Sequence, residues 1–522
     1  MGDCVDTLLA LDLGTSGCRA EFFGLDGQSL ARCHREYDLL SPEPGAAEQN
    51  PETWWWSLAA CVREARGQLG EVAVLAIGVS AQGHSWVPVD ARLEPLRHAL
   101  TWLDARAGAQ ARGLLERYGA AFWGARAGKL PGQWHMLPQL LWLREHEHDR
   151  LADARHLLCA HDYLVARLTG EVVTDATNAA TTLLFDIAAG AWSAQLLMEH
   201  ELDASLLPEV RPAGSLAGRL RAEAAGELGL TAGMPVAVGA QDQKCAALAA
   251  GLEAGTATAS LGTATALIAL LDAPRFSPEH GAIPCFPYLQ PGQWMLEAPL
   301  ATTGGAVRWL RDASFCRAGA CTPPIRPVSP TRGGVQAPAL QTATASGYDA
   351  MVAAAEAVPP GSAGVLFFPY LAGAAAPFWR GDAHAAFCGL TLATGLGHMT
   401  RAVLEAVAYD LRANLDHMQA LGCAIERLVL FGGGARSALW TEIIAAVSDL
   451  PVLAGADTEA ASRGAAMLAA QAIGLHASPL KLRVQPVAVR PEWRAAYGPL
   501  REAFARARNR YFTFDERLRG QS

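Results

Sequence analysis

The chain has 522 residues, of which 51% are hydrophobic and 18% charged, and its formal net charge is −9. The hydrophobic fraction excludes a disordered chain, and the excess of acids argues against a nucleic-acid or anionic-membrane partner. The N-terminus carries acids where a signal peptide would carry bases, and no window reaches about 18 apolar residues free of charge or proline. We therefore expect a cytoplasmic protein of roughly two to four domains with no membrane span.

The eleven cysteines are an odd number scattered along a large chain, which does not indicate a disulfide framework. Only Cys316 and Cys321 lie close together, and neither a second pair nor a histidine couple accompanies them. The sequence therefore predicts reduced thiols and no zinc site.

The first part of the chain alternates strands and a helix, a pattern typical of an α/β sheet. Asn50 is the expected N-cap of a helix, with Pro51 at its first position. A hairpin turn is expected at 25–28. The predicted elements are strands over 7–13 and 19–24, a helix over 51–67 and a buried strand over 72–80.

The same order recurs later, with strands over 235–240, 257–261 and 265–271 and a helix over 243–250. DLGTSGCRAEFF (12–23) has a counterpart in SLGTATALIALL (260–271), each a strand end, a Gly-Thr turn and a second apolar strand. This similarity favours two like halves that face one another, although two short Gly-Thr hairpins can also arise by chance.

The remaining elements are predicted from helix-capping residues, turn residues and local composition. The stretch 311–346 is rich in Pro, Gly, Ser, Thr and Arg and is expected to be a surface excursion. A helix is expected over 399–419 with Thr400 as N-cap, then a strand over 427–431, a turn at 432–435 and a helix from Ser437. A final helix near 499–511 is expected to be a solvated cover.

The Gly-Thr turns are the best candidates for phosphate binding. The P-loop pattern GxxxxGK[ST] is absent, and no GxGxxG follows a strand as in dinucleotide-binding folds. Asp12 stands at a strand end before Gly14-Thr15-Ser16-Gly17, where a carboxylate can hold a hydrated divalent cation beside phosphate-binding amides and hydroxyls. The turn at 261–265 offers the same phosphate-binding chemistry, so the two loops together describe a clamped nucleotide.

A series of segments from about residue 7 to 515 resembles the FGGY carbohydrate kinases, most of all the bacterial xylulokinases, in the family's order. These segments are DLGTSG (12–17), EQNPETWW (48–55), GVSAQGH (78–84), TWLDAR (101–106), LPQLLWLREHE (137–147), LTGEVVTDATNAATTLLFDI (168–187), GAQDQ (239–243), SLGTAT (260–265), FFPYLAG (367–373), RAVLEAVAYDLR (401–412) and GGGARSALW (432–440).

The resemblance implies a duplicated actin-like ATPase (ribonuclease H-like) α/β fold, with domains 1–245 and 246–522 around a central cleft. It implies ATP-dependent phosphorylation of a small-molecule sugar, with Mg²⁺ held through water by Asp12. It implies that Asp242 is the catalytic base, and a helix start favours such an ionised carboxylate. The implied sugar contacts are Gln82, Gly83, His84, Asp104 and Gln243, and the implied ATP contacts are Thr15, Ser16, Gly262, Thr263, Gly433, Gly434, Ala435 and Ser437.

Several of these assignments have structural alternatives. Asp242 can cap its helix, His84 can be a satisfied core histidine, and Asp104 can pair with Arg106 or Arg97. The turn at 433–437 can be a simple strand-to-helix connection. Lys244 is expected on a helix surface, and the tryptophans at 54–56 are expected to pack in the core because adjacent helical residues do not share a face.

Substrate identity is the least constrained feature. A ketopentose such as xylulose leads, with ribulose, another ketose or a sugar alcohol as alternatives. The family's WND is Trp102-Leu103-Asp104 here, the xylulokinase Asp-Asn is Asp242-Gln243, and the family's GER is 373–375, Gly-Ala-Ala. Trp134-His135 stands where xylulokinases tend to have small or apolar residues, and Gly83-His84 replaces the Arg-Glu pair of glycerol kinases.

Two other functional classes fit the sequence less well than a kinase. A non-catalytic sugar or nucleotide sensor of the same fold would not need both phosphate loops and the base. A chaperone-like ATPase would need a peptide-binding domain after the ATPase half, which the sequence does not contain. A homodimer is compatible with the sequence but not indicated by it.

Overall fold

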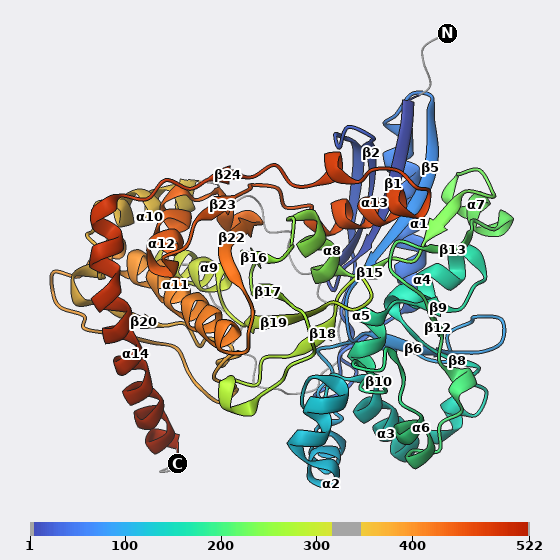
Figure 1. Cartoon of the computed structure of the whole chain (residues 1–522), viewed down its shortest axis with the longest axis horizontal. Helices are drawn as coiled ribbons and strands as arrows, with labels where there is room; N and C mark the ends of the chain where they lie inside the picture. The colour runs from blue at the N-terminus through green and yellow to red at the C-terminus, as the bar shows by residue number, and fades with distance from the viewer. Residues whose placement is uncertain (1–4, 316–345, 520–522) are drawn as a thin grey trace.

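The computed structural model describes residues 5–315 and 346–519, so most of the predicted excursion at 311–346 lies outside the described residues. Two mixed sheets lie in different halves of the molecule (Figure 1). The first has the order β13 (Leu216–Arg219), β14 (Pro235–Ala237), β5 (Val72–Ala81), β1 (Val5–Leu13), β2 (Gly17–Gly24) and β3 (Ser29–Glu36), with β15 (Ala240–Gln241) also beside β5.

The second sheet repeats the pairing of the first. In the first half, β1 is antiparallel to β2 and parallel to β5. In the second half, β16 is antiparallel to β17 and parallel to β22. The predicted internal duplication is therefore confirmed. The order is β18 (Cys285–Pro287), β19 (Trp294–Leu300), β17 (Thr265–Leu271), β16 (Gly255–Ser260), β22 (Ile425–Phe431), β23 (Val452–Ala454) and β24 (Gln485–Pro486).

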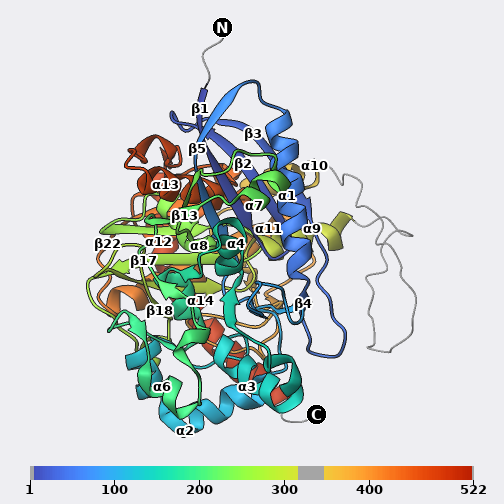
Figure 2. The ribbon, with the colours of Figure 1, turned by 90° about the vertical axis from the view of Figure 1, so that its right-hand side faces the viewer.

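Side chains of β1 alternate between two helix-covered faces, as the two-residue period of a strand requires. Leu9 and Leu11 pack in the cluster that contains Trp54 of α1 (Pro51–Gly67), and Leu8 packs in the cluster built around α13 (Ala460–Ala472). The two helices lie on opposite faces of the sheet (Figure 2). A chain segment near the C-terminus thus completes the first half, and the predicted division at residue 245 stays a prediction.

Close backbone approach fixes α13 on this sheet. A Cβ atom at Gly78 of β5 would lie 1.9 Å from the carbonyl oxygen of Ala465. Such a distance is sterically impossible, so only glycine allows the helix to sit this close to the strand.

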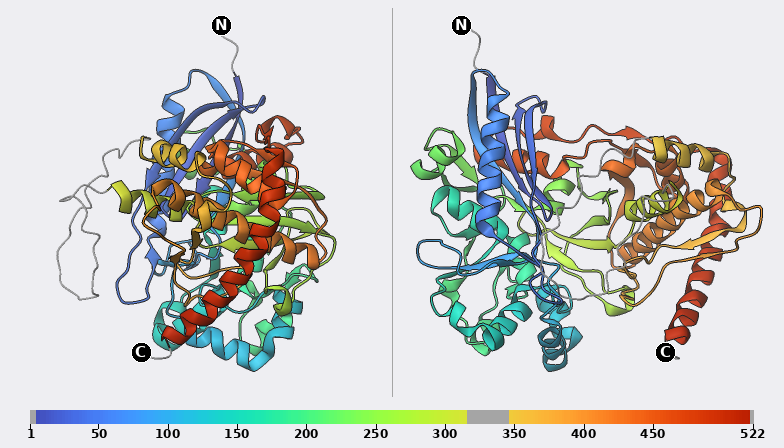
Figure 3. Two further views of the ribbon diagram at one scale, coloured as in Figure 1. Left: turned by 90° about the vertical axis from the view of Figure 1, so that its left-hand side faces the viewer. Right: turned by 180° about the vertical axis from the view of Figure 1, so that it is seen from behind.

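Two helices of the second half differ from their predictions. Helix α11 (Leu396–Ala420) begins after Gly395, and the predicted cap Thr400 is buried inside it. Helix α14 (Pro491–Arg519) runs along the outer side of this half (Figure 3) and buries Tyr497, Phe504 and Phe512. The prediction of a merely solvated cover was wrong for that face, because its aromatic side chains complete the core.

Of the three adjacent tryptophans in α1, Trp54 and Trp55 are fully buried, as predicted, whereas Trp56 is 48% exposed.

The first half also carries a small four-stranded sheet and the helices around it. The sheet has the order β4 (Glu48–Gln49), β7 (Ala99–Leu100), β6 (Trp86–Val89) and β8 (His156–Cys159), and the longer helices are α2 (Gly108–Ala127), α3 (Met136–His146) and α4 (Ala160–Thr169).

The remaining elements connect these layers. Within the described ranges, no helix combines the length and apolar character needed to cross a membrane. The other helices are α5 (Ala176–Ala179), α6 (Ala194–Glu199), α7 (Ala222–Leu228), α8 (Asp242–Ala249), α9 (Gly304–Phe315), α10 (Ser346–Glu356) and α12 (Ala438–Ser448), and the other strands are β9 (Val173–Thr174), β10 (Phe185–Asp186), β11 (Ala191–Trp192), β12 (Glu209–Val210), β20 (Leu366–Phe368) and β21 (Ala386–Cys388).

Candidate active site

Asp242 is the first residue of α8, directly after β15, as predicted. The N-cap position belongs to Gln241, so the alternative of Asp242 as the cap is wrong. Its Oδ1 accepts a hydrogen bond from the backbone N–H of Gln243 at 2.6 Å. Burial, with the nearby charge of Asp12, raises the pKa of Asp242 to about 7. The carboxylate can therefore exchange a proton near neutral pH.

Asp12 lies in β1, which β5 separates from β15, the strand that leads into Asp242. Its Cα partner across the parallel ladder is Ser80, which also pairs with Ala240. The Ser80 hydroxyl donates to Oδ1 of Asp12 at 2.8 Å, and the Arg19 guanidinium lies 3.6 Å from Oδ2. Burial is the main cause of a raised pKa at Asp12. Two carboxylates thus share one edge of the sheet and repel each other.

The first phosphate loop is a tight turn anchored by side chains. The N–H of Gly14 donates to the carbonyl of Gly17 at 2.9 Å, and the Tyr37 hydroxyl donates to the carbonyl of Gly14. Trp102 Nε1 donates to the Thr15 hydroxyl at 2.8 Å. Ser16 is exposed at the tip. The loop is therefore held in shape before any ligand arrives.

The predicted ATP contacts of the second half are brought together by backbone hydrogen bonds. The N–H of Gly434 donates to the carbonyl of Leu261 at 2.9 Å, which ties the 433–437 turn to the loop that contains Gly262 and Thr263. A Cβ atom at Gly434 would lie 2.7 Å from a ring carbon of Trp440, whereas one at Gly433 would meet open space. Ala435 lies in the same short turn, and Ser437 caps α12 by accepting from the N–H of Trp440.

A third segment, which the sequence analysis did not identify, contacts the loop that contains Gly262 and Thr263. The N–H groups of Thr303 and Gly304 donate to the carbonyls of Thr263 and Gly262 at 3.0 and 2.9 Å. A Cβ atom at Gly304 would lie 2.5 Å from the Gly262 oxygen. The Gly-Gly pair in ATTGGA (301–306) is the signal that could have identified this segment.

The predicted sugar contacts Gln82, Gly83 and His84 follow the end of β5. A Cβ atom at Gly83 would lie 2.0 Å from Nε2 of Gln241, so the glutamine side chain fills this space. His84 adopts a positive φ of 68° and its ring meets that of His135 edge to face at 5.1 Å. Burial, then the His135 and lysine charges, lowers the pKa of His84 well below its usual value. The imidazole is therefore neutral at physiological pH.

Two buried amide oxygens in this region have no hydrogen-bond partner within the described part of the chain. They are Oε1 of Gln82, whose Nε2 donates to Gln49 at 2.8 Å, and Oε1 of Gln241. An unpaired buried acceptor is costly unless a ligand supplies a donor. Hydroxyl groups of a bound sugar would supply such donors.

Gln243 connects the two halves. Its Oε1 accepts a hydrogen bond from the hydroxyl of Ser260, at the end of β16, at 3.3 Å. The side chain thus reaches from the start of α8 to the second phosphate loop.

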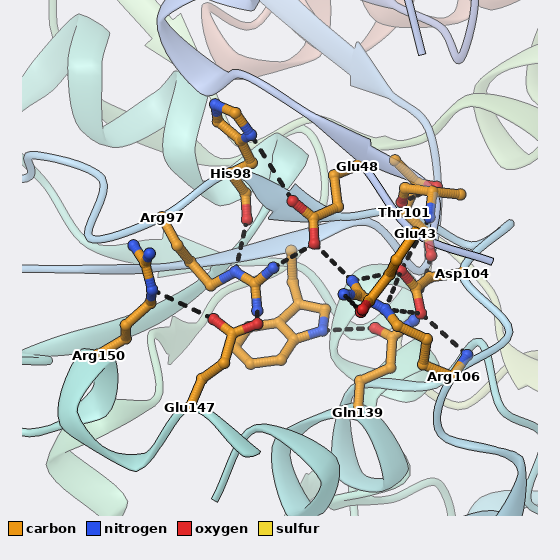
Figure 4. A network of polar contacts seen from close by, with 12 residues as sticks. Glu43, Glu48, Arg97, His98, Thr101, Asp104, Arg106, Gln139, Glu147 and Arg150 are labelled. Carbon is orange, nitrogen blue, oxygen red and sulfur yellow. Dashed lines mark hydrogen bonds and ion pairs between the residues drawn. The ribbon is translucent and has the colours of Figure 1, made fainter. Parts of the chain in front are cut away.

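Asp104 is 1% exposed and belongs to a network of ion pairs (Figure 4). Its carboxylate accepts from the backbone N–H of Ala47 at 2.9 Å and from Arg106 at 2.7 Å. Arg106 also pairs with Glu43 and Glu48. The ion pair of the alternative is therefore present in the structure, and the role of Asp104 as a sugar contact stays a prediction.

The prediction of Lys244 as a surface residue was wrong. Its side chain is fully buried and its ammonium forms an ion pair with Glu297 of β19. Lys129 is also buried, at 2% exposure, and its Nζ donates to the carbonyl of Ala180 at 2.8 Å. Both ammonium groups lie over the ring of Phe286, at 4.1 and 3.7 Å from its centroid. The scarcity of lysine in the sequence was the signal for these two residues.

Comparison with known proteins decides the family. Models of the FGGY family of carbohydrate kinases match residues 7–249 for the N-terminal domain and 257–473 for the C-terminal domain. The chain belongs to the FGGY family of carbohydrate kinases.

Relatives of this FGGY kinase include enzymes with different substrates. It is 30% identical to xylulose kinase of Escherichia coli strain K12 over 95% of this chain and 98% of that one. It is 32% identical to glycerol kinase of Leptothrix cholodnii over 90% and 91% of the two chains. The solved structure of xylulose kinase from Rhodospirillum rubrum superposes with a TM-score of 0.86 at 28% identity, covering 98% of this chain and 100% of that one.

The matches confirm the two-domain, actin-like ATPase type of fold and the phosphotransferase class with an alcohol acceptor. The identities do not separate xylulose from glycerol kinases, so the substrate has to be argued from the pocket.

A divalent cation fits the acidic edge of this FGGY kinase. Asp12 and Asp242 are close enough that the charge of one raises the pKa of the other, and a hydrated cation would relieve this repulsion. In the described part of the chain, no group of three or more histidine, cysteine or acidic side chains forms a cage for a metal ion. Two carboxylates suit Mg²⁺, which keeps several waters when it binds through one or two carboxylates.

Proposed function

We propose that the protein transfers the γ-phosphoryl group of ATP to a hydroxyl of a small sugar-like substrate, with Asp242 as the general base. The observation that carries this proposal is the placement of Asp242, whose pKa is raised to about 7 by burial and by Asp12, next to Gln243, which contacts Ser260 of the second half. The base therefore lies where the two halves of the molecule meet. FGGY membership supports the same reaction.

Each group in the site has a distinct part in this reaction. Asp242 accepts the hydroxyl proton as the oxygen attacks phosphorus. The loops around Thr15 and Thr263 hold the phosphates, and the turn at 433–437 accommodates the nucleoside. Asp12 would hold Mg²⁺, and the bound ion would offset negative charge on the phosphates.

The sugar is held by the polar groups at the end of β5. The unpaired oxygens of Gln82 and Gln241 accept from substrate hydroxyls, and neutral His84 offers one ring nitrogen as donor or acceptor. Closure of the two halves would exclude water, which otherwise competes as the phosphoryl acceptor.

Among neutral sugars, xylulose is the first to test. The order of motifs and the similarity to xylulose kinases support it. The substitutions at Leu103 and Gln243 and the absence of a charged pair at 374–375 argue for an altered pocket. Glycerol is disfavoured because Gly83-His84 replaces the charged pair of glycerol kinases.

An ADP-release assay over ketoses, aldoses, polyols and sugar acids tests the proposal. We expect at least one of them to stimulate Mg²⁺-dependent ADP formation well above the rate with water alone. A flat response across the panel, together with nucleotide binding, would instead support the alternative of a non-catalytic sensor. Cytoplasmic location stays a prediction, as does a homodimer.

A further inference from the structure

Gln49, the second residue of β4, lies between the candidate sugar site and the first phosphate loop. It is 1% exposed, and its side-chain amide makes three hydrogen bonds. The nitrogen Nε2 donates to the backbone carbonyl of Thr15 at 2.6 Å, and the oxygen Oε1 accepts from Trp54 Nε1 at 3.1 Å and from Gln82 Nε2 at 2.8 Å. One buried amide therefore joins a predicted sugar contact to a predicted phosphate contact.

The fully buried indole of Trp54 fixes the direction in which this amide faces. An indole N–H can only donate, so it requires the oxygen of Gln49 on its side. A backbone carbonyl can only accept, so Thr15 requires the nitrogen. The reversed amide would place two donors together at Trp54 and two acceptors together at Thr15, and buried groups left unpaired in this way are costly. The orientation of Gln49 is therefore determined by its two neighbours.

This orientation also decides what Gln82 offers to a ligand. Because the oxygen of Gln49 faces Gln82, the nitrogen of Gln82 has to point toward Gln49 and its oxygen elsewhere. That oxygen, Oε1, is buried and has no hydrogen-bond partner among the residues that the structure describes. The backbone N–H of Gln82 donates at 2.7 Å to the carbonyl of Leu13, which ends β1 just before the phosphate loop. Gln82 thus presents an acceptor to a substrate hydroxyl while its other groups contact the phosphate-loop side of the site.

We propose that Gln49 is a positioning residue that couples sugar binding to phosphate binding. This inference rests on the proposed kinase function and adds a residue to its machinery. A substrate hydroxyl that donates to Oε1 of Gln82 polarises both amides, because hydrogen bonds in a chain strengthen one another where water is excluded. The bond from Gln49 to the Thr15 carbonyl then holds the loop more firmly in the shape that binds phosphate. Such coupling is reciprocal, so a bound nucleotide raises the affinity for the sugar by the same factor.

The test measures by calorimetry how much a sugar changes the affinity for a nucleotide. The sugar is D-xylulose, or whichever sugar gives the most ADP formation, and the nucleotide is adenylyl imidodiphosphate with Mg²⁺, an ATP analogue whose terminal phosphate is not transferred. We expect a saturating sugar to lower the Kd of the analogue at least about fivefold in the wild-type protein. Gln49→Met, which has a similar length but no amide, should reduce this ratio to less than about twofold. Gln68→Met, at an exposed glutamine that also donates to a backbone carbonyl, should keep the wild-type ratio.

A second variant keeps the test decisive if Gln49→Met folds poorly. Gln82→Met breaks the same chain from the sugar side and should also reduce the ratio to less than about twofold at saturating sugar. A purely structural role for Gln49 would lower the Tm and leave the ratio unchanged. The inference is overturned if the wild-type protein shows no such ratio, or if either variant keeps it. A wild-type ratio that Gln49→Met abolishes, without ADP formation from any sugar, would support the coupling and contradict the proposed kinase function instead.

Discussion

The two phosphate loops share a backbone design but differ in the side chain at the end of the first strand. In both, an antiparallel hairpin follows a strand that is also paired in parallel with a third strand. The first loop begins at Asp12, whereas the second begins at Ser260. The duplication therefore preserves the Gly-Thr turn but not the acidic residue that precedes it in the first half.

The loops also differ in what holds them. The first is fixed by side chains, with Tyr37 on the Gly14 carbonyl and Trp102 on Thr15. The second is fixed by the segment 303–304, whose N–H groups and Thr303 hydroxyl donate to the loop carbonyls. We infer that aromatic side chains from distant segments hold the first loop, whereas the second depends on the close approach of Gly304 to the Gly262 carbonyl.

The largest expected effect comes from the base that lies between these loops. Asp242→Asn should lower kcat by on the order of 10²–10⁴, since the amide cannot accept the substrate proton. Substrate-induced shifts in Tm should persist because the side chain keeps its size. Steady-state ADP formation measures kcat. A value within about threefold of the wild-type kcat would show that Asp242 does not have its proposed role.

The next largest effect separates the two strand-end residues. Asp12→Asn should reduce kcat by on the order of 10² and raise the Mg²⁺ concentration needed for half-maximal rate, because it removes the charge that holds the ion. Ser260→Ala, its counterpart, should change kcat by only a few-fold. A Mg²⁺ titration of both variants checks this contrast, and equal losses would mean that the loops have the same role.

The pH dependence of kcat/KM tests the role of Asp242 without a substitution at that residue. The pKa of Asp242 is raised to about 7, so its carboxylate is protonated below that pH and cannot accept a proton. We expect kcat/KM to fall about tenfold per pH unit on the acid side of an apparent pKa near 7. Lys244 lowers this pKa, so Lys244→Met should move the acid limb to higher pH. An unchanged limb in that variant would show that another group titrates.

Sequence alone predicted the elements that are determined locally. The helix over 51–67 and the strand over 265–271 match the structure at both ends, and for the helix an asparagine cap and a first-turn proline mark its start. Predictions failed where a distant partner decides the outcome. Lys244 is buried because Glu297, far along the chain, neutralises it.

The same physical reason accounts for the site residues that sequence did not reveal. Asp104 pairs with Arg106 and accepts from the amide of Ala47, contacts that depend on how distant segments pack. Lys129 lies in none of the segments that resemble the family, and only the fold brings it to Phe286. The order of the motifs indicated the reaction, whereas these side-chain contacts depend on the three-dimensional arrangement.

The smallest expected effect is on the free energy of unfolding, when a methyl group is added to a glycine in each of the two loops. A Cβ atom at Gly17 would lie 2.5 Å from the carbonyl oxygen of Arg35 on the neighbouring strand, a backbone atom that cannot move aside cheaply. At Gly262 the nearest atom is 3.2 Å away, and it belongs to the same loop. Gly17→Ala should therefore lower the free energy of unfolding by about 1–3 kcal/mol, and Gly262→Ala by less than about 1 kcal/mol. Urea denaturation of both variants measures the difference, and equal destabilisation would mean that the second loop is held as rigidly as the first.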